Sequence, residues 1–237
     1  MLEIKILLKE SIGVKEVGEI YNPTIKDIIN LGEDRLNEYL SALAFSKDSL
    51  PQDESSTFLE KLTNFDIVYL ITDKNFRKTL LEAIGFFTQK EVMLFDEVSM
   101  IGIGKQNKLY KDNYDEFVDV ILKMFLRERA KPEHKKKQKM SERQRKIYEK
   151  LTKYRKKQRE KESLKLIDII NIVKHGGASF ISAEEIKNMT YFELMKCFEV
   201  IMSKSNYDEY IRYKTSPNFK VEDTVQHWTL SIKHSAK

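Results

Sequence analysis

The sequence predicts a mainly helical α+β protein, and three observations lead to this prediction. First, only 8 glycines and 4 prolines occur among 237 residues, whereas sandwiches and barrels need many turn-forming residues. Second, most apolar residues recur at helical spacing, and only a few short segments alternate as strands do. Third, 41% hydrophobic and 33% charged residues, with a mean hydropathy of -0.51, describe a soluble chain with enough apolar side chains for a core.

The first predicted unit, residues 1–130, combines short β-hairpins with helices. Apolar residues at alternate positions in segment 2–8 predict a half-buried strand, which a second strand near residues 17–21 completes as a hairpin. Thr24 is suited to cap the following helix, and Asp27 lies favourably in its first turn. One helical stripe then continues across Gly32, its weak point, and contains Ile25, Ile28, Ile29, Leu36, Tyr39, Leu40 and Leu43.

The same unit is predicted to contain two further helices and a second hairpin. Asp73 can cap a helix that carries Phe76, Leu80, Leu81, Ile84 and Phe87, and a short hairpin is expected over residues 91–109. The clearest helix of the chain comes next. Its apolar residues follow the 3.6-residue period strictly: Tyr114, Phe117, Val118, Ile121, Leu122 and Phe125.

A basic linker, residues 131–140, is expected to separate the two units. Pro132 disfavours helical backbone at Lys131, and the residues after it lack apolar periodicity. Ser141 and Gln144 match a capping box, which predicts a long basic helix running through Val173 to a stop at Gly176-Gly177. This helix opens the second unit, residues 141–237, which is predicted to be entirely helical.

Shorter helices complete the predicted second unit. Capping boxes are expected at Ser182 with Glu185 and at Thr190 with Glu193. Further short helices are predicted over residues 206–213 and 221–233, the latter carrying the single tryptophan, Trp228. The buried face of the helix after Thr190 is predicted to contain Tyr191, Leu194, Met195, Phe198, Ile201 and Met202.

Positive charge is concentrated in residues 127–165, which hold 18 Lys or Arg against 6 Asp or Glu. Such a segment is compatible with a solvated helix face, with an acidic protein partner, or with nucleic acid. Nucleic-acid binding is the weaker functional interpretation, because few aromatic residues interrupt the charges and no helix-turn-helix or RNA-recognition signature is near. The candidate partner-binding residues are Lys135, Lys136, Lys137, Arg143, Arg145, Lys146, Tyr148 and Tyr154.

No residue pattern predicts catalysis, a cofactor or a metal. Segment 102–105 lacks the spacing of both phosphate-binding glycine motifs, and a hairpin turn is the better interpretation. The four histidines, His134, His175, His227 and His234, have no ligand partners at a recognised spacing. The acidic residues Asp112, Asp115, Glu116 and Asp119 share a helix face, but they lie near a helix N-terminus, where carboxylates are favoured without any function.

The predicted compartment is the cytoplasm. Cys197, the only cysteine, cannot form an internal disulfide, and its neighbours predict a structural thiol rather than a nucleophile. No signal peptide and no membrane-spanning apolar run is readable.

The order of elements and five short motifs resemble the tail assembly chaperones of long-tailed phages and phage-derived elements in Gram-positive bacteria. The motifs are Glu19-Ile20-Tyr21-Asn22-Pro23-Thr24, Asn113-Tyr114-Asp115-Glu116-Phe117, Met189-Thr190-Tyr191-Phe192-Glu193-Leu194, Tyr207-Asp208-Glu209-Tyr210 and His227-Trp228. The resemblance covers most of the chain.

The resemblance implies a protein that is not an enzyme. Such a chaperone coats the long helical tape-measure protein before tail assembly, and its C-terminal part recruits tail-tube subunits; self-association is compatible with this role. In several such phages a programmed frameshift near the junction of the two parts produces the long form. The lysine run at 135–137 therefore suggests a shorter product ending near Lys137, which a gene continuous in one frame with no short product would refute.

Overall fold

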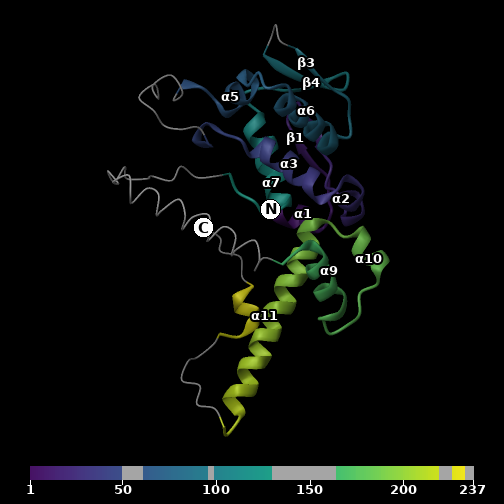
Figure 1. Ribbon diagram of the computed structural model, residues 1–237, viewed down its shortest axis with the longest axis vertical. Coiled ribbons are helices and arrows are strands. Elements are labelled where there is room, and N and C mark those ends of the chain that lie inside the picture. The colour runs from purple at the N-terminus through teal and green to yellow at the C-terminus, as the bar shows by residue number, and fades with distance from the viewer. Residues whose placement is uncertain (50–60, 96–98, 130–163, 219–225, 233–237) are drawn as a thin grey trace, which may run out of the picture. The chain divides into compact units, whose positions relative to one another are not determined.

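The structure is a computed structural model that describes residues 1–49, 61–95, 99–129, 164–218 and 226–232. The predicted mainly helical α+β class is confirmed, with two small antiparallel sheets among the helices (Figure 1). The chain divides into two compact units, of which one contains residues 1–131 and 182–196 and the other residues 132–181 and 197–237. They are called unit 1 and unit 2 below.

Unit 1 contains both sheets and most of the helices. The helices are α1 (Leu2–Leu7), α2 (Ile25–Leu31), α3 (Glu33–Ala44), α5 (Asn64–Leu70), α6 (Lys74–Thr88), α7 (Tyr114–Met124), α10 (Ala183–Asn188) and the start of α11 (Tyr191–Thr215), with a 3-10 turn at Lys47–Ser49. The strands are β1 (Ile12–Val14) and β2 (Gly18–Ile20) in one sheet, and β3 (Val92–Phe95), β4 (Met100–Ile103) and β5 (Asn107–Leu109) in the other.

The core of unit 1 is built around α7. This helix packs against α1, α3 and α5, while α6 packs against α3, β2 and β3. The six apolar residues that predicted α7 are all buried: Tyr114, Phe117, Val118, Ile121, Leu122 and Phe125. The predicted helix is therefore confirmed, and its apolar stripe is the centre of the unit.

The predicted strand over residues 2–8 is wrong, because this segment forms helix α1. Ile6 is 0% exposed, but Ile4 and Leu8 are 56% and 62% exposed. Burial therefore follows the four-residue spacing of Leu2 and Ile6 on a helix, not the alternation of a strand. The first hairpin instead pairs β1 with β2, with Ile12 opposite Ile20.

Capping residues begin the helices where the sequence predicted them. Thr24 accepts a hydrogen bond from the Asp27 backbone N–H, the Asp27 side chain returns to Thr24, and Asp73 caps α6 through the Phe76 N–H. The single helical stripe predicted across Gly32 forms two helices. Gly32 has a φ of +92°, which ends α2 before α3 begins. Ile29, which was expected in the buried stripe, is 58% exposed.

Three antiparallel strands replace the simple hairpin predicted over residues 91–109. Met93 faces Gly102 in the β3–β4 pair, and Ile103 faces Asn107 in the β4–β5 pair. The predicted turn is confirmed, since residues 104–106 connect β4 to β5 and Gly104 has a φ of +59°.

Unit 2 contains α9 (Leu166–His175), the larger part of α11 and α12 (Trp228–Ser231). The predicted continuous helix from Ser141 to Val173 is wrong at Lys165, which is extended; beyond it the predicted helix is confirmed as α9, which ends before Gly176. The Asp168 carboxylate accepts a hydrogen bond from the Lys165 backbone N–H at 3.0 Å and marks this helix start. The first half of the predicted helix, and the linker at 131–140, lie outside the described residues.

Helix α11 is longer than predicted. It continues through residues 206–213, where a separate short helix was expected, because no glycine or proline interrupts segment 191–215. Its predicted buried face is only partly correct: Leu194 is buried and the other predicted residues are half-buried, whereas Phe192, which was not predicted on this face, is buried. The last predicted helix, 221–233, is reduced to α12 within the part of the chain that the structure describes.

Segment 182–196 groups with the first unit, although the sequence placed it in the second. The Ile25 N–H donates to the Met189 carbonyl at 2.8 Å, and Thr24 forms an isolated β-bridge with Thr190. Lys9 forms an ion pair with Glu193 at 2.9 Å. These contacts join residues far apart in the sequence, so local periodicity could not reveal them.

Candidate functional site

The predicted partner-binding residues of the basic segment all lie outside the described residues. They are Lys135, Lys136, Lys137, Arg143, Arg145, Lys146, Tyr148 and Tyr154. The candidate site must therefore come from the described residues, beginning with the motifs that carry the family resemblance.

Two of these motifs meet in unit 1. Thr24 ends the first motif and Thr190 lies in the third, and the β-bridge joins them. The hydroxyl of Tyr21 donates to Asp27 at 2.7 Å. Burial and the neighbouring carboxylate raise the pKa of Tyr21 to about 12, so this hydroxyl remains a donor. These motif residues therefore hold segment 182–196 and the start of α2 in place.

The motif at residues 113–117 joins three segments of unit 1. The Asn113 amide donates to the Lys15 carbonyl at 3.2 Å and to the Lys108 carbonyl at 3.1 Å, and its oxygen accepts from the Tyr110 N–H at 2.9 Å. Tyr114 is fully buried and donates to the Leu43 carbonyl at 3.3 Å. Burial raises the pKa of Tyr114, which keeps its hydroxyl protonated.

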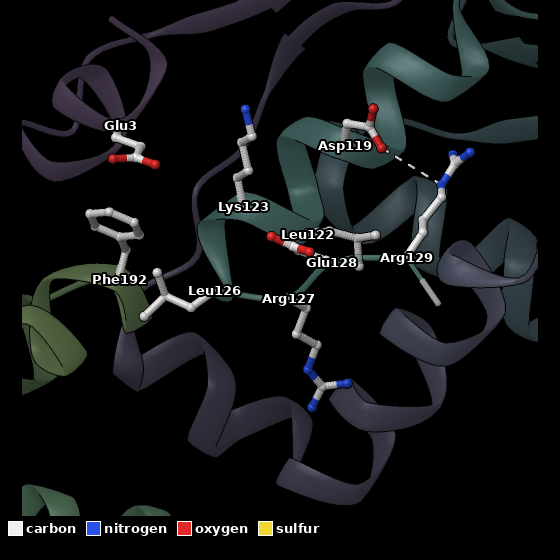
Figure 2. A pocket seen from close by; sticks show the side chains of 9 residues that line it. All are labelled: Glu3, Asp119, Leu122, Lys123, Leu126, Arg127, Glu128, Arg129 and Phe192. Carbon is white, nitrogen blue, oxygen red and sulfur yellow. Dashed lines mark ion pairs between the residues drawn. The ribbon is translucent and has the colours of Figure 1, made fainter. Parts of the chain in front are cut away.

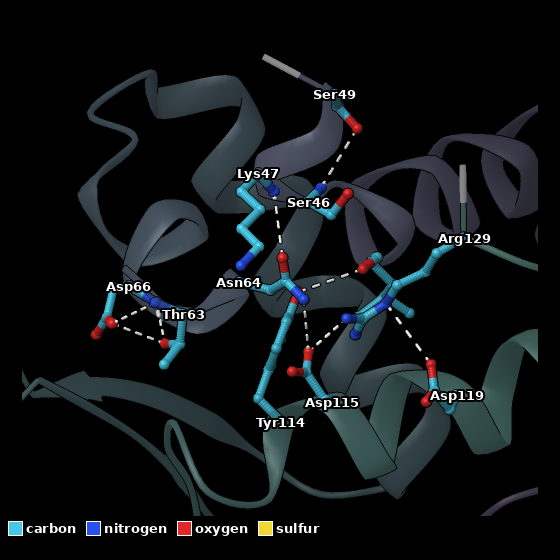
Figure 3. Close-up of polar contacts among 11 residues, drawn as sticks. Ser46, Lys47, Ser49, Thr63, Asn64, Asp66, Tyr114, Asp115, Asp119 and Arg129 are labelled. Atoms are coloured by element: carbon cyan, nitrogen blue, oxygen red, sulfur yellow. Dashed lines mark hydrogen bonds and ion pairs between the residues drawn. The ribbon is translucent and has the colours of Figure 1, made fainter. Parts of the chain in front are cut away.

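Arg129 lies at the end of the described part of unit 1 and is held by the acidic face of α7 (Figure 3). Its guanidinium bonds to Asp115, lies 3.7 Å from an Asp119 oxygen, and stacks 5.7 Å from the Tyr114 ring centroid. Asn64 also donates to Asp115, at 3.1 Å. Asp115 and Asp119 thus act as structural partners of an arginine, and they are not arranged as paired carboxylates for acid–base chemistry.

A cleft of about 430 Å³ opens beside this cluster, at the C-terminal end of α7. Its apolar part consists of Leu122, Leu126 and Phe192, of which Leu126 is 46% exposed. Figure 2 shows Glu3 and Phe192 at one end of the cleft and Asp119 with Arg129 at the other. Charges of both signs line it: Glu3, Asp119 and Glu128 against Lys123, Arg127 and Arg129.

Sequence reasoning missed this cleft because its residues come from three distant segments. Phe192 was quoted as part of a motif but not placed on the buried face of its helix. Arg127 and Arg129 were counted only as part of the basic segment. The one available signal was the apolar residue Leu126 directly after the strict stripe of α7.

The last two motifs meet in unit 2. The rings of Tyr207 and His227 lie 4.9 Å apart in an edge-to-face arrangement, and His227 lies 5.7 Å from Trp228. His227 also caps α12 by accepting from the Thr229 N–H. The closing tryptophan is therefore placed beside α11.

Among the residues that the structure describes, no group of three His, Cys, Asp or Glu side chains could hold a metal ion. Within those residues, no helix is long and apolar enough to cross a membrane. Cys197 is half-buried on α11.

Comparison of the chain with known protein families, with curated proteins and with solved structures gives no match.

Proposed function

We propose that the chain is a tail assembly chaperone, a binding protein rather than an enzyme, which holds the helical tape-measure protein of a long-tailed phage or phage-derived element. In this proposal it works in the cytoplasm of the bacterial host and recruits tail-tube subunits. The observation that carries the proposal is the unit 1 cleft, because its lining matches the surface of an amphipathic helix.

The lining of the cleft supports a protein helix as its ligand. An exposed helix of a coiled-coil type carries an apolar stripe bordered by both acidic and basic residues. The cleft offers the complement, an apolar floor with three acidic and three basic residues around it. A nucleic acid would instead favour an excess of positive charge.

Helix α1 extends this surface with exposed apolar residues. Ile4, Leu7 and Leu8 are 56%, 41% and 62% exposed, and Leu7 lies one turn after Glu3, which lines the cleft. Apolar residues grouped in this way are typical of protein-binding surfaces. Together, the cleft and α1 form the surface that we assign to the tape-measure protein.

The test is co-expression of the full chain with the tape-measure protein encoded beside it. We expect the tape-measure protein to remain soluble and to copurify with the chain. Leu126→Glu and Leu7→Glu each place a charge on the proposed surface and should reduce capture by about tenfold, which corresponds to about 1.4 kcal/mol. Leu70→Glu is the matched control, since Leu70 is 58% exposed on α5 and does not line the cleft.

Three outcomes would overturn this assignment. They are failure of the wild-type chain to capture the tape-measure protein at low salt, unchanged capture by both surface variants while both remain folded by circular dichroism, and loss of capture by the Leu70→Glu control. Neighbouring genes give an independent check, because a very long helical tape-measure gene is expected directly downstream.

Nucleic-acid binding through residues 127–165 is the alternative that the same preparation tests. The described residues do not favour it, because Arg129 is paired with Asp115 and Arg127 donates to Asn37. A gel-shift assay with duplex DNA and single-stranded RNA over a salt titration decides the question. Tight binding that weakens steeply with salt would support the alternative, since phosphate contacts release counterions.

A further inference from the structure

A second groove follows α11 within unit 2 and is separate from the proposed tape-measure surface. Its volume is about 800 Å³, and the α11 residues that line it recur every four positions from Val200 through Lys204 and Asp208 to Arg212. This spacing places them on one face of the helix over about 20 Å. Figure 1 shows α11 as a long helix, with its C-terminal half in the yellow-green part of the colour range.

The floor of the groove is apolar and lacks bulky side chains on one side. Val200 is 36% exposed, and Ile201 packs close to Gly176, where an added Cβ would lie 3.2 Å from an Ile201 methyl. Gly176 and Gly177 also line the groove, together with Trp228 from α12. Because Gly176 and Gly177 have no side chains, Ile201 packs closely against their backbone and the floor carries no bulk at these two positions.

The charged residues of the groove are in an ordered pattern. Lys204, Asp208 and Arg212 are exposed and stand one turn apart, so their charges alternate as positive, negative, positive, and Glu209, which also lines the groove, adds a second negative charge beside Asp208. Within the described residues, none of these three side chains forms an ion pair or a hydrogen bond. Neighbouring opposite charges at this spacing often pair with each other on a helix, and here all three remain available to a ligand.

We propose that this groove binds an amphipathic α-helix of another protein, with a stripe of small apolar residues bordered by acidic, basic and acidic side chains at successive turns. The pattern on α11 is the same when read in either direction, so it accepts a parallel or an antiparallel partner helix. Because a strand or an irregular loop does not repeat every four residues, a helix fits this face best.

A second copy of the chain fits the groove poorly. If two copies paired antiparallel about Asp208, that residue would face Asp208 of the second copy, and Lys204 would face Arg212 of the second copy. A shift by one turn would pair Lys204 with Asp208 of the second copy, but it would set Arg212 against the apolar Val200. Like charges placed opposite each other are unfavourable at a helix interface. The charge pattern therefore selects a different protein, and this conclusion does not rest on the proposed tape-measure function.

The single tryptophan allows a direct test, because Trp228 lines the groove and tryptophan-free peptides add no signal. The full chain is titrated with helical peptides of about 20 residues, which span about 30 Å. One peptide carries alanine and leucine on its stripe with Glu, Lys and Glu at successive turns, and the other has these charges exchanged. We expect the first to bind at least about tenfold more tightly, by fluorescence and by calorimetry.

Charge reversal in the groove sharpens the test. The triple variant Lys204→Glu, Asp208→Lys and Arg212→Glu should exchange the preference between the two peptides. Val200→Glu should weaken both peptides by about tenfold or more. Ile167→Glu is the control, because Ile167 is 58% exposed on α9 and does not line the groove; it should leave binding unchanged.

Equal binding of both peptides by the wild-type chain would overturn the proposal, as would an unchanged preference in the triple variant. A wild-type dimer that dissociates in the Val200→Glu variant, with no peptide binding in either, would also overturn it and assign the groove to a second copy. These results are independent of tape-measure capture, so either proposal can fail while the other stands.

Discussion

The start of α7 and the second half of α11 both carry polar side chains but use them differently. At the start of α7, Asn113 and Tyr114 are buried, and their polar side chains bond to backbone atoms of distant segments. On α11, Lys204 and Arg212 are exposed and have no side-chain partner among the described residues. The presence or absence of partners, more than residue type, separates a folding element from a docking surface.

Removal of an aromatic ring from the core should have the largest effect on stability. We expect this large loss on α7 and not on α11. Phe117 is 0% exposed, so Phe117→Ala is expected to lower the free energy of unfolding by about 3–5 kcal/mol. The comparison variant on α11 is Ile211→Ala. Ile211 is 37% exposed, so its truncation should cost less than about 1 kcal/mol. Urea unfolding measures both, and equal losses would remove the distinction between the two regions.

Loss of the Asn113 side chain should have the next largest effect. Asn113→Ala leaves three backbone groups without their partner at a site that is 5% exposed, and we expect a loss of about 3 kcal/mol. Asn206→Ala on α11 is the matched control, which should be neutral or stabilise the protein by up to about 0.5 kcal/mol because alanine favours helices. A comparable loss in both variants would contradict the assigned role of Asn113.

Asp27 should make the stability of unit 1 depend on pH. Burial opposes ionisation of its carboxylate, but hydrogen bonds from Thr24 and Tyr21 outweigh this effect and lower the pKa of Asp27. Its contribution is therefore complete above the usual aspartate pKa of about 3.9 and is lost as pH falls through the lowered value.

Asp27→Asn should accordingly cost about 1 kcal/mol near pH 7 and flatten the fall in stability below about pH 4. Thermal unfolding across this pH range measures the effect. A variant whose pH profile matches that of the wild-type chain would show that the capping box does not carry this dependence.

The smallest effect on stability is expected in the α11 groove. Asp208→Asn should change the free energy of unfolding by less than about 0.5 kcal/mol, because the side chain is exposed. The same variant should reduce the discrimination between the two charge-patterned peptides. A large loss of stability would place Asp208 among folding residues and undermine the contrast with α7.

The sequence predicted those helices that are determined by interactions within a few residues, such as an apolar stripe or an N-terminal cap. The strict stripe of α7, the Thr24 cap and the Ser182 capping box were predicted and confirmed. Helix α5 was missed, although Thr63 and Asp66 form the same box as Thr24 and Asp27 and carried an available signal. Helix α1 was predicted as a strand because a short run of alternating apolar residues does not indicate which of them are buried.

The arrangement in space could not be predicted, because it depends on contacts between distant segments. Met189 and Thr190 join Ile25 and Thr24 through the backbone, and no periodicity reports such a pairing. The unit 1 cleft likewise combines Glu3, Leu126 and Phe192. The residues predicted to bind partners lie between 135 and 154, outside the described residues, and those assignments stay predictions.

Hydrogen exchange of the full chain, alone and in complex with the tape-measure protein, tests the central claim most directly. The account predicts slower exchange on binding in α1 and at the C-terminal end of α7, and little change in α5, which carries the control residue Leu70. Slowed exchange elsewhere in the chain, with α1 and the end of α7 unchanged, would contradict the assignment of the cleft as the tape-measure site.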